Sequence, residues 1–312
     1  MNQENDFPSL AAVRSFFSEQ LSRWDDARQR FEKLKDVKIK QLTLSELTLD
    51  AQFNPSRIVS TGAKIDKGAI AKRPCFLCEQ NRPPQQIKLS AFGGEFQVLI
   101  NPFPILPGHL VIACSHHVEQ RLGAHFHKMC VMASALPGYM VFYNGPKCGA
   151  SAPDHLHFQA GMRGSVPIER DWSLFSKALH PVASAKGVYS VENYACPALA
   201  IEGGISESVA AFDALYGKLQ AKSGAEEFPL NVVVWKEGDD LVTVVFLRSK
   251  HRPDCYFAEG AEKLLVSPGS VDMGGLLITP REEDFNAITA QKASGILSEV
   301  TFSKAEVERF LA

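Results

Sequence analysis

The sequence has 312 residues, which is longer than most single domains, so it predicts two domains or one large core built from two similar halves. Hydrophobic residues make up 45% and charged residues 22% of the chain, as in a globular protein, and this composition excludes extensive disorder. A formal charge of −2 excludes a global field that recruits nucleic acid or an anionic membrane. Any phosphate-bearing ligand must therefore be held by local groups.

The N-terminal segment and the cysteines predict a cellular compartment. The first residues, "MNQENDFPSLAAVRSFF", lack a basic stretch followed by an apolar one, and no apolar run approaches about 18 residues. The chain has 7 cysteines, an odd number that fits free thiols and metal ligands better than a disulfide framework. We therefore expect a cytoplasmic protein that binds neither nucleic acid nor a membrane.

The first half of the chain alternates between helical and extended patterns. Residues 7–35 carry apolar side chains at helical spacing, which predicts one or two amphipathic helices, and residues 37–61 have a β-like pattern. The stretches "EFQVLIN" and "HLVIACS" predict two strands of a hairpin, joined by the turn-rich "PFPILPG". A helix is expected over residues 118–136.

Two more strands are predicted before residue 165, at "GYMVFYNG" and "DHLHFQAG". A helix is predicted at "SESVAAFDALYGKLQAK", and "LNVVVWKEGDDLVTVVFLRS" predicts a hairpin of two β-branched runs around a turn. The tail holds a strand candidate, "GGLLITP", and a helix candidate, "AITAQKASGILSEV". We divide the chain into a helical segment (1–36), a catalytic half (37–165) and a second α+β half (166–312) on the acceptor side.

The stretch "GASAPDHLHFQAG", residues 149–161, sets polar side chains at every second position. In an extended strand His155, His157 and Gln159 lie on one face, and the apolar residues between them lie on the other. A half-buried strand with a solvated polar face is the alternative, but two histidines and a glutamine in register favour a functional face. The preceding "NGPKCGAS" offers backbone N–H groups that can converge on an anion.

These residue types suit phosphoryl chemistry. A neutral imidazole is a competent nucleophile toward phosphorus and a good leaving group afterwards, which predicts a double displacement. A glutamine can donate a hydrogen bond to phosphoryl oxygens, but unlike a histidine it cannot protonate a leaving group. The pattern therefore favours group transfer over hydrolysis.

The motif "HLHFQ" resembles the His-x-His-x-Gln signature of the transferase branch of the histidine triad superfamily. That branch includes galactose-1-phosphate uridylyltransferase, the GDP-hexose phosphorylases and the dinucleoside polyphosphate phosphorylases. The resemblance extends through "NGPKCGASAPDHLHFQ" and "VLINPFPILPGHLVIACSHHVEQ", over roughly residues 50–165. It implies an α+β fold with a mostly antiparallel sheet flanked by helices, and it raises the hypothesis of a diverged duplication of two such halves.

The resemblance also implies an activity. His157, the second histidine of the signature, would be the nucleophile, and Gln159 would orient the phosphoryl group. The expected enzyme is a nucleotidyltransferase or phosphorylase that moves a nucleoside monophosphate from a nucleoside diphosphate sugar to phosphate or a sugar phosphate. A nucleotidyl-histidine would be the intermediate. A homodimer is compatible with this expectation.

Nucleotide-binding residues follow from the same resemblance. Asn101, at the end of "VLIN", would hydrogen-bond the ribose, and Asn144 and Ser151 would contact the α-phosphate. Gly149 would permit close approach of the backbone. Lys147 is a candidate on its charge and its place in the loop alone, and a solvated loop lysine is the alternative.

Other basic residues are candidates from charge and position. Arg248, Lys250 and Arg252 gather at the end of a predicted hairpin strand, where they would bind the acceptor phosphate or form a solvated strand end. Arg57 in "FNPSRIVSTG" is a further candidate for contact with the nucleotide.

A metal site is suggested by Cys75 and Cys78, whose two-residue gap lets both sulfurs reach one tetrahedral ion. By resemblance to uridylyltransferase-like proteins, His117 and His155 would complete a structural zinc site, with His116 as an alternative to His117. Two thiols without a metal are the other interpretation. A bound ion would stiffen the strand that carries the nucleophile.

The remaining histidines and cysteines receive no chemical role. His109 belongs to a turn pattern, and His125 and His127 are expected on the surface of a helix. The other cysteines are expected in the core or in loops, and they are Cys114, Cys130, Cys148, Cys196 and Cys255.

Two alternative functions remain at this point. The same histidine could support phosphorolysis of dinucleoside polyphosphates of the Ap4A type. A nucleotide-binding sensor, or a zinc-stabilised scaffold without turnover, is the alternative from another class, and the combination of a glycine-containing loop with His157 argues against it.

Overall fold

The protein is built around one long antiparallel sheet in the computed structural model, which describes residues 6–58, 68, 70, 73–224 and 226–312. Within these residues the sheet has ten strands. In spatial order they are β3 (Leu89–Ala91), β4 (Phe96–Ile100), β5 (Leu110–Cys114), β7 (His157–Met162), β6 (Tyr139–Asn144), β11 (Leu230–Glu237), β12 (Asp240–Leu247), β10 (Ala198–Gly203), β9 (Tyr189–Val191) and β8 (Leu179–Pro181). The expected α+β class with a mostly antiparallel sheet is confirmed.

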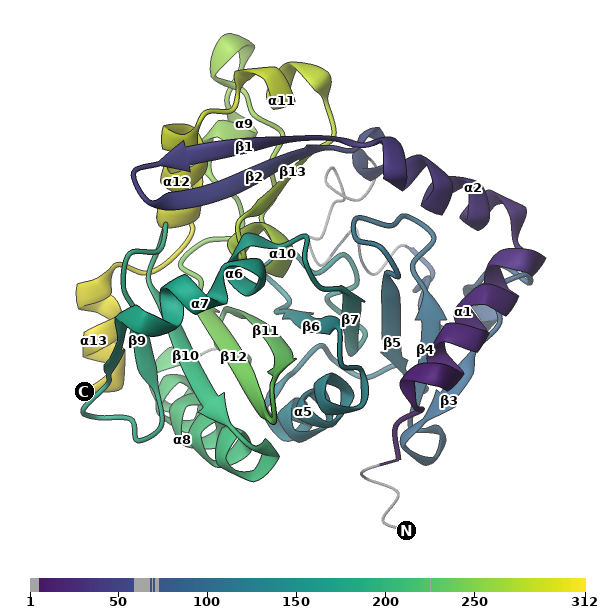
Figure 1. The fold of residues 1–312 in the computed structure, drawn as a ribbon, viewed down its shortest axis with the longest axis horizontal. Helices are drawn as coiled ribbons and strands as arrows, with labels where there is room; N and C mark the ends of the chain where they lie inside the picture. Colours follow the sequence, from purple (N-terminus) through teal and green to yellow (C-terminus); the bar gives the residue numbers. More distant parts are fainter. Residues whose placement is uncertain (1–5, 59–67, 69, 71–72, 225) are drawn as a thin grey trace.

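The sheet consists of two halves with the same topology (Figure 1). In the first half β3, β4 and β5 are followed by α5 (Phe126–Ala135) and then by β6 and β7, with β7 beside β5. In the second half β8, β9 and β10 are followed by α8 (Ile205–Ser223) and then by β11 and β12, with β12 beside β10. The halves meet where β6 pairs with β11. The strand order therefore displays the duplication that the sequence suggested.

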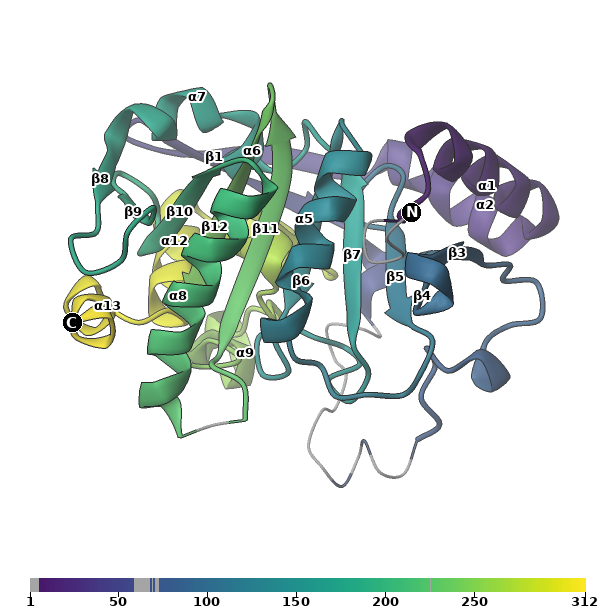
Figure 2. The same ribbon diagram turned by 90° about the horizontal axis from the view of Figure 1, so that it is seen from below.

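Helices α5 and α8 cover one face of the sheet, as Figure 2 shows. The β-branched residues of β11 alternate between the two faces, so Val232 and Val234 pack toward the core beneath these helices and Val233 packs on the opposite side. Phe126 of α5 stacks on Phe212 of α8, with ring centroids 3.8 Å apart. This apolar layer packs the two helices onto the central strands.

A smaller sheet and the remaining short helices cover much of the opposite face (Figures 1 and 2). The small sheet contains β1 (Lys38–Leu44), β2 (Leu47–Phe53) and β13 (Leu276–Thr279), and β13 runs parallel to β2. The helices in this region are α6 (Pro167–Arg170), α7 (Trp172–Phe175), α9 (Asp254–Phe257), α10 (Ser270–Met273), α11 (Glu282–Ala287) and α12 (Ala290–Glu299). The N-terminal and C-terminal parts of the chain therefore meet above the central sheet.

The N-terminal helices α1 (Leu10–Arg23) and α2 (Asp25–Lys33) lie beside the β3–β4 edge of the large sheet (Figure 1). Ser9 begins α1 because its Oγ accepts a hydrogen bond from the backbone N–H of Ala12 at 3.3 Å. The fully buried Gln20 donates to the carbonyl of Gln85 at 2.8 Å and accepts from the N–H of Ile87 at 2.7 Å. This side chain attaches the helix to the segment that precedes β3.

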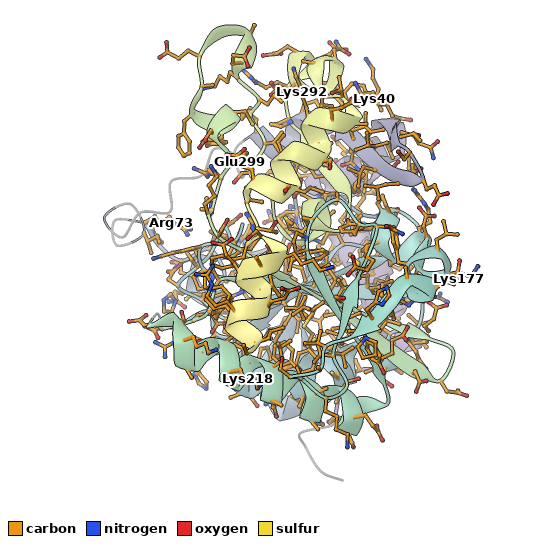
Figure 3. The ribbon with its side chains drawn as sticks, turned by 90° about the vertical axis from the view of Figure 1, so that its left-hand side faces the viewer. Lys40, Arg73, Lys177, Lys218, Lys292 and Glu299 are labelled. Carbon is orange, nitrogen blue, oxygen red and sulfur yellow. The ribbon has the colours of Figure 1, made fainter. Side chains whose placement is uncertain are left out.

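The C-terminal helix α13 (Lys304–Leu311) packs near α8, on the side of the molecule that Figure 3 presents. Ser303 and Glu306 form a capping box at its start. Lys218, labelled in Figure 3, donates from α8 to the carbonyl of Leu311 at 3.1 Å and anchors the end of the chain. Within the described part of the chain, every helix is too short or too polar to span a bilayer.

Two sequence-based expectations change in the structure. The helix predicted over residues 118–136 is confined to α5, which starts at Phe126, because the segment before it hydrogen-bonds to the residue that precedes β7 and then forms a 3₁₀ turn. His125 lies in a 3₁₀ turn and is half-buried with its ring against Phe96, so the expected surface position is wrong. The last three residues of the β-like stretch 37–61 lie outside the described residues.

Candidate active site

A cavity of about 760 Å³ opens on the sheet face that carries the odd-numbered residues of β7. The register explains this placement, because Gln159 lies opposite Val111 of β5 and Phe142 of β6, and both of those residues also line the cavity. Seven of the residues expected at the site line it together, namely Arg57, Asn101, Asn144, Gly149, Ser151, His157 and Gln159. Residues far apart in the sequence thus converge on one space.

His157 presents one ring nitrogen to this cavity. Its Nδ1–H donates to the carbonyl of His155 at 2.8 Å, which leaves the Nε2 lone pair free of that bond. Burial lowers the pKa of His157 to about 4. The imidazole is therefore neutral near pH 7, the protonation state that a nucleophile requires.

Gln159 is oriented by His109. The N–H of Ile105 donates to Nδ1 of His109 at 3.2 Å, so the proton of the neutral ring lies on Nε2 and is donated to Oε1 of Gln159 at 3.1 Å. Burial lowers the pKa of His109 to about 3, which keeps this ring neutral. With its oxygen held, Gln159 directs its amide N–H groups toward the cavity as donors.

Asn144 is held by residues of the second half of the chain. Its Oδ1 accepts from Nδ2 of Asn231 at 2.9 Å and from the N–H of Ser270 at 2.7 Å. The Ser270 hydroxyl also lies 2.8 Å from the same oxygen. Because the oxygen is saturated, the amide nitrogen of Asn144 is the atom that remains for a ligand.

The loop between β6 and β7 packs against the segment before α10. Gly149 has a φ of +93°, and a Cβ there would lie 2.7 Å from Cα of Gly269 and 2.9 Å from the carbonyl oxygen of Pro268. Only glycine fits this position without displacing backbone. Gly149 thus permits a close backbone approach, and its partner in the structure is the second half of the chain.

The cavity has a mixed polar rim around an apolar interior. Asn101 accepts from the N–H of Phe103 at 2.9 Å, and Arg57 donates to the carbonyl of Phe103 at 3.0 Å. The carbonyl of Ser151 accepts from Arg73 at 2.8 Å. Burial raises the pKa of Asp272, another lining residue, to about 6. Two guanidinium groups thus border a space large enough for a nucleotide.

The other basic candidates do not line this cavity. Lys147 is exposed, and Lys250 pairs with Asp254 at 2.7 Å and with Glu299. Arg252 donates to the Ser267 hydroxyl at 2.9 Å, and Ser267 lines the cavity, so Arg252 contacts one residue of its wall.

Arg248 occupies a structural position. It is fully buried, and its five N–H groups donate to the side chain of Asn231 and to four backbone carbonyls. Since Asn231 in turn holds Asn144, Arg248 supports the site from the core and has no N–H group left for an acceptor phosphate.

Cys75, Cys78, His117 and His155 form a cluster whose ligand atoms all lie within 4.8 Å of one another. Nδ1 of His155 lies 3.3 Å from Sγ of Cys75 and 3.6 Å from Sγ of Cys78, and Nδ1 of His117 lies 3.2 Å from Sγ of Cys78. Tetrahedral metal–ligand bonds of about 2.0–2.3 Å separate donors by roughly 3.3–3.8 Å, so this set fits one ion. The structure brings His117, and not His116, to the cluster.

Hydrogen bonds orient the histidines of this cluster. Nε2–H of His155 donates to the carbonyl of Cys114 at 2.8 Å, which turns its Nδ1 lone pair toward the two sulfurs. Nε2 of His117 lies 3.5 Å from a carboxylate oxygen of Asp154. Because His155 lies two residues before His157, an ion held here would stiffen the start of β7.

For several residues at the site, the sequence predicted no functional role. His109 was assigned no chemistry because it precedes its strand in a turn, where the alternation of faces gives no information. Asn231 and Ser270 come from the second half, and no pattern in the sequence connects them with Asn144. The β-branched run around Asn231 offered only one signal, a polar residue in an otherwise apolar strand.

The duplicated half has lost the polar face. Asn231 of β11 lies opposite both Asn144 and Phe246, so the face of β12 that corresponds to the His157 face of β7 carries Val242, Val244 and Phe246. These three residues are buried in the core beneath the small sheet. A separate cavity of about 570 Å³ lies between β8–β10 and α13 and shares no lining residue with the first.

Comparisons with known proteins are consistent with this architecture. Residues 16–162 match the family described as a domain of unknown function (DUF4922), and residues 175–311 match the family "GDPGP1-like, C-terminal domain". No curated protein matches the sequence. The two family matches divide the chain close to the boundary between the duplicated halves.

Solved structures share the fold. Yeast Ap4A phosphorylase Apa2 aligns with a TM-score of 0.62 at 16% identity, over 89% of this chain and 97% of that chain. Its complex with Ap4A aligns with a TM-score of 0.60 at 16% identity, over 89% of this chain and 96% of that chain. The ADP-glucose phosphorylase from Arabidopsis thaliana aligns over 85% of this chain and 100% of that chain at 14% identity, but its TM-score of 0.38 carries no weight.

These findings define the class of the protein as a duplicated α+β fold of the histidine triad type. The fold is shared with yeast Ap4A phosphorylase Apa2, and the second half of the chain matches the GDPGP1-like C-terminal domain. At 16% identity the structural likeness establishes the fold alone.

Proposed function

We propose that the protein is a nucleotidyl phosphorylase that transfers a nucleoside monophosphate from a nucleoside diphosphate sugar to inorganic phosphate or a sugar phosphate. The observation that supports this proposal most strongly is the free Nε2 of His157, which faces a nucleotide-sized cavity while Nδ1–H donates to the carbonyl of His155. Covalent nucleotidyl transfer requires a neutral, oriented imidazole beside groups that can donate hydrogen bonds to a phosphoryl group.

In the first half-reaction, Nε2 of His157 attacks the α-phosphorus. The bond between that phosphorus and the bridging oxygen breaks, and the sugar phosphate leaves with the electron pair. The developing positive charge on the imidazole is stabilised by the carbonyl of His155, which accepts the Nδ1–H. The amide groups of Gln159 and Asn144 donate to the phosphoryl oxygens as their charge increases.

In the second half-reaction, an oxygen of the acceptor attacks the same phosphorus. The N–P bond breaks, neutral His157 is restored, and inorganic phosphate becomes the β-phosphate of a nucleoside diphosphate. Because Gln159 is an amide, it supplies no proton to either leaving group. None is needed, because the first leaving group is a phosphate of low basicity and the second is the imidazole of His157, which leaves as a neutral ring that keeps its Nδ1–H.

Phosphorolysis of a dinucleoside polyphosphate is the second candidate. It is favoured by the likeness to yeast Ap4A phosphorylase Apa2, whose structure was also determined with Ap4A and with AMP. The chemistry at His157 would be the same, and only the leaving group would differ. A sensor or scaffold without turnover accounts less well for a free, neutral His157 over a cavity.

We further propose that the cluster of Cys75, Cys78, His117 and His155 holds a structural zinc ion. Two sulfurs and two imidazole nitrogens at the separations of a tetrahedron are a donor set that zinc prefers. The ion would supply rigidity to the strand that carries His157 and would take no part in the bonds that form and break.

The test is phosphate-dependent turnover of a panel of substrates. Purified protein is incubated with ³²P-labelled phosphate and ADP-glucose, GDP-glucose, UDP-glucose or Ap4A, and the products are separated by chromatography. The main proposal expects label in the β-phosphate of a nucleoside diphosphate together with unlabelled sugar 1-phosphate. Label in ADP together with free ATP from Ap4A alone would favour the second candidate. No product from any substrate, with phosphate or with glucose 1-phosphate as acceptor, would contradict both.

A further inference from the structure

The backbone pairing between β6 and β7 ends just before the residues that would take part in the reaction. Its last rung joins Phe142 and Gln159, and the same register would bring Tyr143 opposite Phe158 and then Asn144 opposite His157. On its other side His157 still pairs with Ala113 of β5. Strands β6 and β7 therefore separate at the point where both carry a functional side chain.

The side chain of Gln120 fills the place of the missing rung. Its Oε1 accepts from the N–H of His157 at 2.8 Å. Its Nε2 donates to the carbonyl of His157 at 3.1 Å and to the carbonyl of Asn144 at 2.9 Å. One amide thus behaves as a peptide group inserted between the strands and satisfies three backbone groups that the ladder leaves unpaired.

Gln120 is itself fixed from outside the site. It is fully buried, and its carbonyl accepts from the hydroxyl of Tyr143 at 3.0 Å. The carbonyl of Val118 accepts from the N–H of Leu156 at 2.8 Å, and the N–H of Leu122 donates to the buried carboxylate of Glu227 at 3.0 Å. These contacts use the backbone of segment 118–122, which leaves it outside the helix and explains the late start of α5.

We propose that Gln120 is a positioning residue that sets the separation between His157 and Asn144, and with it the gap in which the reacting phosphoryl group lies. Gln120 does not line the cavity, so it acts through the backbones of the two residues that do. This inference rests on the proposed function for its kinetic consequence. The hydrogen bonds themselves do not depend on it.

The test compares Gln120→Met with Gln20→Met, because both glutamines are fully buried and both bridge backbone groups, but Gln20 lies between α1 and the segment before β3. At saturating nucleoside diphosphate sugar, we expect Gln120→Met to slow adduct formation about 10²-fold, the usual cost of misplacing reacting groups by about 1 Å. Gln20→Met should lower the thermal midpoint similarly and change the rate less than about threefold. Equal rates for the two variants would overturn the proposal.

A second readout does not require turnover. Calorimetry measures the affinity for adenosine, guanosine and uridine and for their 5′-monophosphates. For the base that binds best, the affinity of the monophosphate divided by that of the nucleoside reports the contribution of the phosphate. Gln120→Met should reduce this ratio at least fivefold while nucleoside affinity stays within about twofold, and Gln20→Met should leave the ratio unchanged. An unchanged ratio in Gln120→Met would contradict the proposal, and it does so whether or not the wild-type protein forms an adduct.

A third measurement covers the case in which Gln120→Met does not fold. Amide hydrogen exchange in the wild-type protein should show the His157 N–H protected as strongly as ladder amides of β7, because its partner is Oε1 of Gln120. Rapid exchange of that amide would overturn the proposal. Failure of the wild-type protein to form any adduct, with protection and phosphate ratio as expected, would reject the proposed function and retain the positioning role.

Discussion

His109 and Gln159 form one unit, in which Nε2–H of the histidine donates to Oε1 of the glutamine at 3.1 Å. The bond determines which end of the amide faces the cavity. We expect His109→Phe to slow nucleotidyl transfer about tenfold, and Gln159→Ala to slow both half-reactions about 10²-fold, the order for losing a donor to a developing charge. Rates of the two half-reactions are measured separately by rapid quench.

The pair also makes a prediction for the double variant. Because His109 acts through Gln159, the double replacement should be no slower than Gln159→Ala alone. If the rate reductions of the two single variants multiply in the double variant, His109 contacts substrate independently or holds other parts of the site.

Buried His109 should contribute a pH dependence to stability. Its folded-state pKa of about 3 lies below the ordinary value, so between about pH 3 and 6.5 the unfolded chain binds a proton that the folded protein does not. The contribution is complete above about pH 6.5 and is lost as the pH falls. In urea unfolding from pH 4.5 to 7, His109→Phe should therefore show a shallower slope, by up to about 1.4 kcal/mol per pH unit. An identical slope in both proteins would reject a neutral, buried His109.

Arg248 should behave as a structural residue. Arg248→Met leaves Asn231 and several buried carbonyls without their donor, at about 1–3 kcal/mol for each orphaned group, so we expect a large fall in the free energy of unfolding. At a permissive temperature its KM for phosphate should match that of the wild type. Lys250→Ala, a change at a partly exposed ion pair, is the control and should change stability little. A selective rise in the KM for phosphate in Arg248→Met would restore Arg248 as an acceptor-binding residue.

The cysteine–histidine cluster predicts metal content and a stability effect. Purified protein should hold about one zinc ion per chain, and Cys75→Ser should lose it and unfold at a lower temperature. The control is Cys255→Ser, since Cys255 is a partly buried thiol outside the cluster. Elemental analysis after dialysis measures the content. Full zinc in Cys75→Ser, or metal-free wild-type protein with every thiol titratable, would contradict this assignment.

The sequence predicted the parts of the fold that local pattern controls. Alternation identified β7 and the hairpin of β11 and β12, and helical spacing identified α8. It failed at residues 118–125, where the bonds of Val118, Gln120 and Leu122 to distant segments keep helix-compatible residues out of α5 and Gly123–His125 form a 3₁₀ turn. Tertiary hydrogen bonds outweighed local propensity there.

For the candidate site, too, the sequence indicated what lies within local motifs and missed what the tertiary structure brings together. Residues within the motifs lie in one cavity, because the motifs themselves are consecutive strands and loops of one half. The residues that support them, such as Ser270 and Asn231, come from the other half, and no pattern in the sequence connects them with the motifs. Arg248 was assigned to the acceptor by charge, and its burial with five satisfied donors could be seen only in three dimensions.

The central claim is that His157 carries the nucleotide covalently, and intact-mass spectrometry tests it most directly. Wild-type protein is incubated without acceptor with ADP-glucose, GDP-glucose, UDP-glucose and Ap4A in turn, and His157→Ala is treated in parallel. One substrate should add the mass of one nucleoside monophosphate to the wild type, in an acid-labile bond, and nothing to His157→Ala, although that variant should still bind the nucleotide. A His157→Ala protein that forms the adduct, or turns over the substrate as fast as the wild type, would contradict the account.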